Sequence, residues 1–228
     1  MQVNPQPEAE PPARPEAALA AGNDSETRRR LKRVARQLFA ERGIREVTVR
    51  EIAREAGQRN QGAVAYHFGT KEALLTELLI DGAARIEARR RVFLDDVEAR
   101  GTPVSVRDAV AAIVIPSAEF SDEDAEYGAH FNRFLLQLSA VDSQFVDRTL
   151  EGRWNEGYQR CLTHLRKLMP DCPPRVQNRR FLFLGNYISS LLAQREAKMV
   201  DGLRHPTWRA RETLDDIILT AAALIEAR

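Results

Sequence analysis

The chain has 228 residues, of which 43% are hydrophobic, and a mean hydropathy of −0.41. No apolar run approaches the roughly 20 residues that cross a bilayer, and the N-terminus has no basic start followed by an apolar stretch, which argues against a signal peptide. Cys161 and Cys172 have no metal-ligand partners at usable spacing. We therefore expect a soluble, cytoplasmic protein that has no membrane partner, metal or cofactor.

Positive charge is concentrated in one part of the chain, although the net charge at pH 7 is only +1. Residues 27–72 hold twelve basic and five acidic side chains, whereas residues 1–26 have a net charge of −4 and residues 73–228 one of −2. A basic segment suits a polyanion such as double-stranded DNA, but charged residues also decorate ordinary solvated helices. The charge alone leaves both interpretations open.

Residues 1–26 are predicted to be a disordered N-terminal tail. They are rich in Pro, Ala and Glu and nearly free of large apolar side chains, so they cannot bury enough surface to offset the entropy of ordering. A DNA-contacting arm is the alternative, and the acidity of the segment argues against it.

A helix with one apolar stripe and one basic face follows the tail. Gly43 ends its pattern. The arginines at its start are candidates for contact with a phosphate backbone. The apolar stripe consists of Leu31, Val34, Ala35, Leu38 and Phe39, and the basic face of Arg28, Arg29, Arg30, Lys32, Arg33 and Arg36.

Residues 48–71 have the pattern of a helix-turn-helix motif. Thr48 and Glu51 form a capping box, which predicts the start of a helix. Gly57 is suited to end this helix, because glycine readily adopts the left-handed conformation. Asn60 or Gln61 is predicted to open the next helix.

The second helix of this motif carries few residues suited to a core. Val64 and Phe68 lie four residues apart and can pack inwards, while the other positions are small, amide-bearing or aromatic with a polar group. Gly69 ends the helix, and Thr70 caps the one that follows. Three helices, the third presented by the first two, are typical of a DNA-reading unit.

These residues resemble a known family. The strings LFAERG and AYHFGTKEALL, together with residues 48–57 between them, resemble the N-terminal domain of TetR/AcrR-type transcriptional regulators over residues 27–79. The turn at residues 58–60 is one residue longer than the commonest family spacing, and Ala65 replaces a usual aromatic residue. The resemblance implies a homodimeric repressor that leaves a pseudo-palindromic operator when a small hydrophobic or amphipathic effector binds.

The predicted DNA contacts divide into two kinds. Asn60, Gln61 and Ala63 are predicted to contact bases, because an amide pairs with adenine and a methyl group contacts thymine. Gly62 allows the backbone to approach the DNA closely. Phosphate contacts are predicted for side chains that carry a hydroxyl, imidazole or ammonium group, namely Thr48, Tyr66, His67 and Lys71.

The rest of the chain is predicted to be helical, because it shows no alternating strand pattern and no internal repeat. The predicted fold is all-α, with a three-helix helix-turn-helix DNA-binding domain over residues 27–72 and a helical effector-binding and dimerisation domain over residues 73–228. The later helices are expected at residues 71–99, 104–117 (ended near Pro116), around 131–138, 145–168, 175–200 and 207–227.

The last two of these helices each carry a broad apolar face. The pattern by itself favours ordinary core packing within one subunit, whereas the resemblance implies a four-helix interface with a second copy of the chain. The two faces consist of Phe181, Leu184, Gly185, Ile188, Leu191 and Leu192, and of Leu214, Ile217, Ile218, Ala221 and Ile225.

Aromatic residues of the central helices are candidates for an effector cavity. Such residues are usually core, and His130 fits a hydrogen-bonded core histidine better than a ligand. Tyr and Trp nevertheless have polar ends that need partners, helical bundles often hold pockets, and the resemblance implies a cavity here. The candidates are Tyr127, His130, Phe131, Phe134, Trp154, Tyr158 and Tyr187, with Arg133 as a further orienting group.

No enzyme motif is present: the chain has no P-loop, GxSxG or HExxH sequence, so we predict that it is not an enzyme. Two alternatives to the repressor remain open. One is a regulator of the same fold that activates transcription or has no ligand. The other is a helical interaction module, or an unrecognised enzyme, whose basic segment is incidental. Salt-dependent binding to duplex DNA separates the last from the others.

Overall fold

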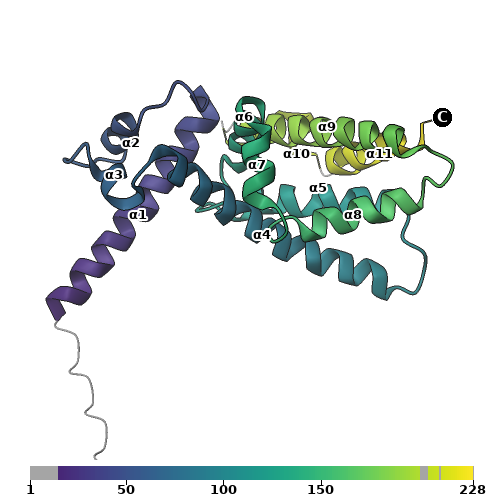
Figure 1. The fold of residues 1–228 in the computed structure, drawn as a ribbon, viewed down its shortest axis with the longest axis horizontal. Helices are drawn as coiled ribbons and strands as arrows, with labels where there is room; N and C mark the ends of the chain where they lie inside the picture. The colour runs from purple at the N-terminus through teal and green to yellow at the C-terminus, as the bar shows by residue number, and fades with distance from the viewer. Residues whose placement is uncertain (1–14, 201–204, 211, 228) are drawn as a thin grey trace, which may run out of the picture.

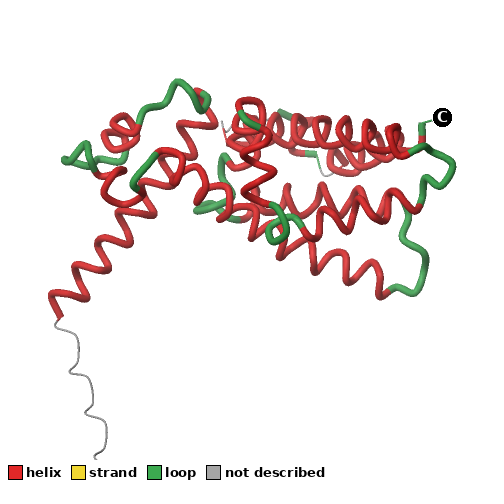
Figure 2. The backbone as a smooth tube through the Cα atoms, in the orientation of Figure 1, coloured by secondary structure: helices red, strands yellow, loops and turns green. Residues whose placement is uncertain are grey.

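The structure, a computed structural model, describes residues 15–200, 205–210 and 212–227. Within these ranges every regular element is a helix, which confirms the all-α fold class (Figure 2). The N-terminal helices form a head at one end of the molecule, and the remaining helices form a longer body (Figure 1). No helix in the described ranges is long and apolar enough to cross a membrane.

The head consists of α1 (Pro15–Arg42), α2 (Val49–Glu55) and α3 (Ala63–Phe68). Residues 15–26, which were expected to belong to a disordered tail, lie in α1, and residues 1–14 of that tail lie outside the described part. The predicted apolar stripe of α1 is buried in one core together with side chains of α2 and α3. The fully buried members of this core include Leu31, Phe39, Ile52 and Val64.

Helix α4 (Lys71–Ala99) connects head and body without a break at the predicted boundary between residues 72 and 73. Thr70 caps it as predicted, because its Oγ1 accepts a hydrogen bond from the backbone N–H of Ala73 at 3.0 Å. The core of the head also continues into the body, where the rings of Phe39 and Phe134 lie 6.1 Å apart. Head and body therefore share packed side chains instead of meeting only through a linker.

Helix α5 (Val106–Glu123) continues past Pro116, where the sequence predicted its end. Proline has no N–H, so the carbonyl of Ala112, four residues earlier, loses its usual helical donor. The buried Arg90 of α4 replaces that donor, because its Nε donates to Ala112 O at 3.0 Å. A tertiary contact thus lets the helix accommodate a proline that sequence reasoning takes as a stop.

The segment predicted as one helix over residues 145–168 is two helices. Helix α7 (Ser143–Leu150) follows α6 (Phe131–Val141), and α8 (Glu156–Lys167) begins after a turn that contains Gly152 at a φ of 73°. The turn reverses the chain so that α8 packs on α4 and α5. This reversal creates the space between α7, α8 and the longer helices.

The C-terminal layer contains α9 (Pro174–Val200), the short α10 (Pro206–Arg209) and α11 (Glu212–Glu226). Helices α9 and α11 lie side by side over α5 (Figure 1). The segment predicted as one helix over residues 207–227 is divided near Ala210, whose backbone is extended. The core under this layer includes Leu184, Ile188, Ile217 and Ala221.

A buried carboxylate joins α9 to the start of α6. The oxygens of Glu196 accept hydrogen bonds from the backbone N–H groups of Asn132 at 2.9 Å and Arg133 at 3.2 Å, and from the hydroxyl of Ser121 at 2.9 Å. Burial raises the pKa of Glu196. Because His130, the residue before α6, makes no side-chain cap, Glu196 supplies the acceptor that this helix N-terminus needs.

Glu98, near the end of α4, holds α8 in place, and we expect this contact to make stability depend on pH. Its carboxylate pairs with Arg160 and with His164 Nε2 at 2.7 Å, and these hydrogen bonds lower the pKa of Glu98 to about 2. A carboxyl group whose pKa falls on folding stabilises the folded state above its unfolded pKa, and the contribution is lost as pH falls.

We expect Glu98→Gln to lower the free energy of unfolding at pH 7, and the difference from wild type to shrink as the pH falls from about 4.5 towards about 2. Urea unfolding at several pH values measures this difference. Asp96→Asn, an exposed change on the same helix, is the control. An equal difference at pH 7 and at pH 2 would show that the charge of Glu98 does not carry the effect.

Candidate DNA-binding surface and candidate effector cavity

The turn between α2 and α3 holds the third helix of the head. The predicted capping box is present: Glu51 N–H donates to Thr48 Oγ1 at 3.2 Å, and Thr48 N–H donates to the Glu51 carboxylate at 3.5 Å. Gly57 has the predicted left-handed backbone, with φ of 68°. The N–H of Gln58 then donates to Ala53 O at 2.9 Å, which closes the end of α2. The chain leaves this turn towards α3.

Helix α3 begins at Ala63, later than the predicted start at Asn60 or Gln61. The side-chain oxygen of Asn60 accepts a hydrogen bond from Gly62 N–H at 2.8 Å, and its backbone carbonyl accepts one from Ala63 N–H at 3.1 Å. Such a local side-chain turn competes with helix and favours the position before it. Gln61 is therefore an exposed turn residue at the start of the helix.

The outward face of α3 contains Ala65 and Tyr66, the latter 76% exposed. Ala63 is only 5% exposed, so its methyl group packs in the core and does not lie where a thymine contact was predicted. Ala65 offers a methyl group on the outer side instead. The helical period set by Val64 and Phe68 was the signal that identifies Ala65 as outward-facing.

His67 does not lie on the outward face. Its side chain is 6% exposed, and its Nδ1 lies 3.6 Å from Asp24 Oδ1 on α1. The imidazole is therefore covered by the first helix, and the predicted phosphate contact has no geometric support. Thr48 is exposed and its hydroxyl oxygen caps α2, which leaves the O–H free to donate to a phosphate.

The ammonium group of Lys71 is directed into the head. It donates to the backbone carbonyls of Ile44 and Val47, both at 2.6 Å, and lies 5.5 Å from the centre of the Phe39 ring. Burial lowers its pKa. Lys71 thus ties the loop between α1 and α2 to the start of α4, and only one of its three N–H donors remains for a phosphate.

The basic face of α1 is partly neutralised by the body. Arg28 and Lys32 pair with Glu77 of α4, and Lys32 also pairs with Asp81 at 2.8 Å. Arg36 is 2% exposed. Arg29, Arg30 and Arg33 remain exposed, and the guanidinium of Arg30 lies beside Gly57, next to the turn that leads to α3.

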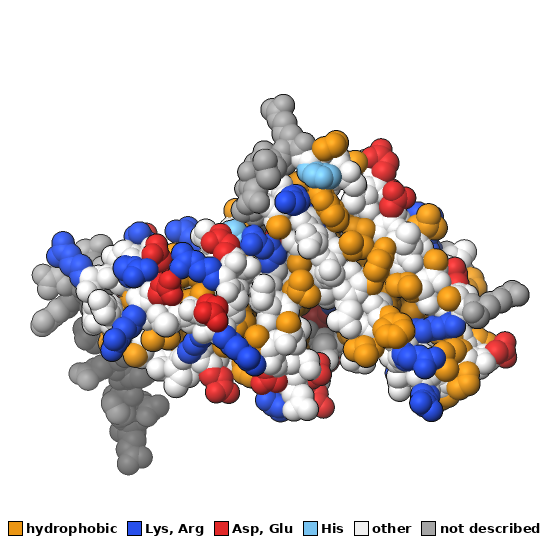
Figure 3. All heavy atoms as spheres, turned by 90° about the horizontal axis from the view of Figure 1, so that it is seen from above, with side chains coloured by type: hydrophobic (Ala, Val, Ile, Leu, Met, Phe, Trp, Pro, Cys, Tyr) orange, Lys and Arg blue, Asp and Glu red, His pale blue; other side chains and the backbone are white. Residues whose placement is uncertain are grey.

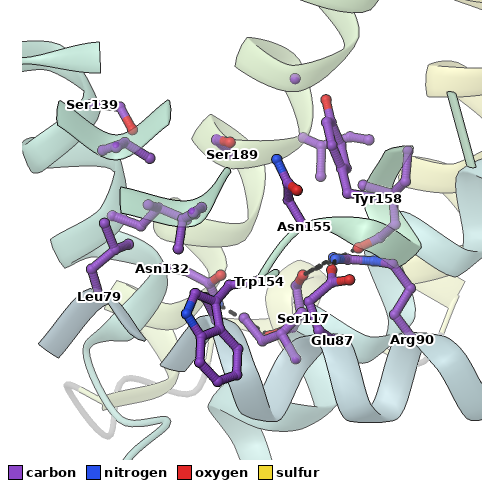
Figure 4. Close-up of a pocket in the computed structure, with 18 of the residues that line it drawn as sticks. Leu79, Glu87, Arg90, Ser117, Asn132, Ser139, Trp154, Asn155, Tyr158 and Ser189 are labelled. Carbon is purple, nitrogen blue, oxygen red and sulfur yellow. Dashed lines mark hydrogen bonds and ion pairs between the residues drawn. The ribbon is translucent and has the colours of Figure 1, made fainter. Parts of the chain in front are cut away.

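A cavity of about 260 Å³ lies in the body between α4, α5, α6, α7, α8 and α9. Its volume is close to the lower end of the range of ordinary ligand pockets, roughly 300–1,000 Å³. Figure 4 shows Leu79 towards one end of the lining and the Glu87–Arg90 pair towards the other. The apolar part of the wall includes Leu79, Ile86, Phe131, Leu135, Leu150 and Leu192.

The seven side chains predicted to contact an effector are divided by the structure. Phe131, Trp154 and Tyr158 line the cavity. The other four do not line it. Phe134 is fully buried in the core that faces the head, and Tyr187 hydrogen-bonds Thr220 on α11. Tyr127 lies in the loop before α6, and His130 is the last residue of that loop. The orienting role proposed for Arg133 has no support either, because Arg133 is absent from the lining.

Two charged residues of the wall were not identified from the sequence. Glu87 and Arg90 are 5% and 6% exposed, pair with each other, and line the cavity (Figure 4). Their spacing of three residues on a helix is a common surface pattern, so nothing in the sequence marked them as buried. Pro116 within a helical segment indicates that the carbonyl four residues earlier needs a donor from elsewhere, but the sequence does not identify that donor.

The cysteines are not arranged as a reactive or metal site. Cys161 is buried in the core, and burial raises the pKa of its thiol to about 12. Among the described residues, no group of three or more His, Cys, Asp or Glu side chains is placed to hold a metal ion.

Comparison with known proteins identifies the head. The model of the family described as "Bacterial regulatory proteins, tetR family" matches residues 32–78, which contain α2, α3 and their turn. Residues 32–78 therefore form a tetR-family domain. The resemblance that the sequence predicted for this part of the chain is thereby confirmed.

Three relatives carry names of repressors. The HTH-type transcriptional repressor KstR2 of Rhodococcus jostii is 34% identical over 113 residues, which are 47% of this chain and 50% of that protein. KstR2 of Mycobacterium tuberculosis is 40% identical over 75 residues, 33% of this chain and 37% of that protein. The HTH-type transcriptional repressor AcnR of Corynebacterium glutamicum is 39% identical over 70 residues, 30% and 37% of the two chains. The matches thus span half or less of each relative's length.

We expect Lys71→Ala to destabilise the protein as well as to affect DNA binding. The change removes the donor to two backbone carbonyls and should lower the free energy of unfolding by about 1–3 kcal/mol. Arg59→Ala, an exposed change in the turn, should stay within about 0.5 kcal/mol of wild type. Chemical denaturation followed by circular dichroism measures both. If Lys71→Ala has the stability of wild type but binds DNA more weakly, the result would support the phosphate contact predicted from the sequence.

Proposed function

We propose that this chain is a homodimeric repressor of transcription that binds a pseudo-palindromic operator through its head and releases it when a small effector enters the cavity. The observation that carries the proposal is the turn-held α3, which exposes Gln61, Ala65 and Tyr66 within a segment that matches the tetR family. The repressor names of the three relatives support the direction of regulation. A cytoplasmic location remains the prediction for such a regulator.

The reading surface that we propose differs in part from the sequence prediction. Gln61 and the free amide nitrogen of Asn60 supply hydrogen-bonding groups for base edges, and Ala65 supplies a methyl group. Thr48 and Tyr66 supply hydroxyl groups, and the exposed Arg30 and Arg59 supply charge, for phosphates on either side. Gly62 lies at the start of this surface, and because it has no side chain the backbone can approach the DNA closely there.

Two heads are needed to read two half-sites, and an exposed apolar patch on α9 and α11 provides the surface that we propose for dimerisation. The predicted interface residues Ile188 and Ile218 are 4% and 3% exposed and belong to the core of one subunit. Leu182 and Phe183 on α9 and Leu219 on α11 are instead 63%, 53% and 53% exposed. Figure 3 shows hydrophobic side chains gathered over this end of the molecule, while basic side chains gather over the head.

The cavity can act on the head only if the effector prefers the conformation whose heads do not fit the operator. Two elements connect them. Helix α4 runs from Lys71, bound to the loop of the head, to Arg90 in the cavity wall. Helix α6 lines the cavity through Phe131 and packs against α1 of the head. Moving such an equilibrium from 1:99 to 99:1 takes about 5.5 kcal/mol of differential binding.

Sequence selection from a random duplex pool tests DNA recognition, and we expect different effects at the two kinds of contact. Gln61→Ala should relax the sequence preference, at a cost of about 1–3 kcal/mol for one bidentate base contact. Arg59→Ala should instead weaken binding to all duplexes alike, and should reduce the slope of log K against log salt concentration by about one. Unchanged specificity in Gln61→Ala with an unchanged salt slope in Arg59→Ala would contradict the proposed surface.

We expect Phe183→Asp to give a folded monomer with little operator affinity, because it places a charge in the proposed two-fold contact. Sedimentation and circular dichroism measure assembly and fold. Val92→Asp, at an apolar residue of α4 that is 64% exposed, is the matched control and should remain a dimer. Ile188→Asp should unfold the subunit instead, since that side chain is buried. A wild-type monomer at micromolar concentration would contradict the proposal.

A further inference from the structure

The charges in the cavity wall are already balanced by the protein. Glu87 and Arg90 pair with each other, and each is bound on its other side by a different helix. The second oxygen of Glu87 accepts a hydrogen bond from Gly157 N–H at 2.6 Å, at the start of α8. A Cβ at position 157 would lie 2.9 Å from that oxygen, so the close approach depends on glycine.

Arg90 is held in the same way. Its Nε donates to Ala112 O at 3.0 Å, the carbonyl that Pro116 leaves without a helical donor, and its Nη2 lies 3.4 Å from Ser117 Oγ. The guanidinium is thus committed to α4 and α5. The third charged residue of the lining, Asp147 on α7, is exposed and therefore solvated.

Several neutral polar groups of the cavity wall make no hydrogen bond to a described residue. Asn155 is the N-cap residue of α8, a position where asparagine normally binds the helix N-terminus, yet its side chain makes no cap bond because Glu87 binds that N-terminus instead. The Tyr158 hydroxyl, and the hydroxyls of Ser139 and Ser189, likewise make no hydrogen bond to any described residue. Burial raises the pKa of Tyr158, so this hydroxyl remains a donor at neutral pH.

The two ends of the cavity differ in polarity. Leu79 and Arg90 lie eleven residues apart on α4, which is about 16 Å along a helix. The polar groups Asn155 and Tyr158 lie near Arg90, while Leu79 lies at the far end (Figure 4). A ligand that fills the cavity therefore meets hydrogen-bonding groups at one end and leucine and phenylalanine side chains at the other.

We infer that the effector of this chain is an uncharged amphipathic molecule, with a carbonyl, hydroxyl or amide group bound by Asn155 and Tyr158 and an apolar chain or ring directed towards Leu79. An ionised ligand would bury its charge, which is costly, because the buried charges of the described lining, Glu87 and Arg90, are paired with each other and Asp147 is exposed to solvent. The inference rests on the proposed function, since it names the ligand class of the proposed effector cavity.

Binding of three ten-carbon probes tests the ligand class: decanamide, decanoate and decylammonium share one chain and differ in the charge of the head group. Fluorescence of Trp154, which lines the cavity, reports binding in a Trp208→Phe background, because the chain has only these 2 tryptophans. At pH 8 we expect decanamide to bind at least about tenfold more tightly than either ion. Equal or tighter binding of an ion, or no saturable binding of decanamide, would overturn the inference.

Two variants separate charge balance from hydrogen bonding. Glu87→Gln keeps an oxygen for Gly157 N–H but leaves Arg90 without its countercharge, so the preference should reverse in favour of decanoate by about tenfold. Tyr158→Phe removes a hydroxyl that has no described protein partner and should weaken decanamide about two- to tenfold. Tyr187→Phe, whose hydroxyl bonds Thr220 outside the cavity, is the control and should bind decanamide like wild type.

Either variant is informative if the other fails to fold. Unchanged decanamide affinity in Tyr158→Phe, or an unchanged order of probes in Glu87→Gln, would contradict the assignment. Operator binding measured separately, without probes, reports on the proposed function. A chain that binds DNA but prefers decanoate would disprove the ligand class alone, whereas a chain that binds decanamide but no DNA would disprove the proposed function alone.

Discussion

The buried pair of Glu87 and Arg90 is the contact on which the body of the molecule depends. It fixes α4 to α5 through the Ala112 carbonyl and α4 to α8 through the Gly157 N–H. Breaking a buried ion pair by removing one partner costs about 3–5 kcal/mol, because the other charge is left uncompensated. The same pair forms the polar end of the cavity, so the contact that joins three helices also sets the electrostatic character of the site.

Other cations of the chain also bind backbone groups of the protein itself. Lys71 binds two carbonyls of the loop between α1 and α2, and Arg36 donates to the carbonyls of Glu126 and Ala129 before α6. Desolvation lowers the pKa of Arg36 to about 10, although nearby carboxylates oppose the shift. The net charge of residues 27–72 therefore overstates the positive charge that the head presents to a polyanion.

These contacts also define how head and body are connected. Lys71 joins α4 to the loop between α1 and α2, and Arg36 joins α1 to the loop before α6, in both cases through backbone carbonyls. Phe39, Phe131 and Phe134 fill the space between head and body with packed rings. A well-packed core transmits displacements because it has no free volume to absorb them. Phe131 also lines the cavity, which places the cavity next to this junction.

The C-terminal helices show how one apolar pattern serves two surfaces. Each helix buries a full stripe in its own subunit and still exposes apolar side chains on the opposite side, such as Phe183 and Leu219. A helix that is apolar over much of its circumference is either fully buried or covered by a partner. The sequence shows the breadth of the apolar surface, but only the packing of α9 and α11 on α5 decides which apolar residues remain exposed.

Local chemistry determined much of this protein. The capping box at Thr48 and Glu51, the left-handed Gly57 and the cap at Thr70 depend only on residues close in the chain, so they and the helix-turn-helix motif followed from the sequence. Helix α4 was predicted over the same residues, 71–99, and begins after the predicted cap at Thr70.

Tertiary structure decided what depends on residues far apart. Pro116 did not end its helix, because Arg90 satisfies the carbonyl that the proline leaves open. His67 and Lys71 were predicted to contact phosphates. The His67 side chain is covered by α1, and the Lys71 ammonium group is bound to the loop between α1 and α2. A side chain's chemistry shows what it can bind, whereas its partner is set by which backbone groups the fold brings within reach, and that information is not local in the sequence.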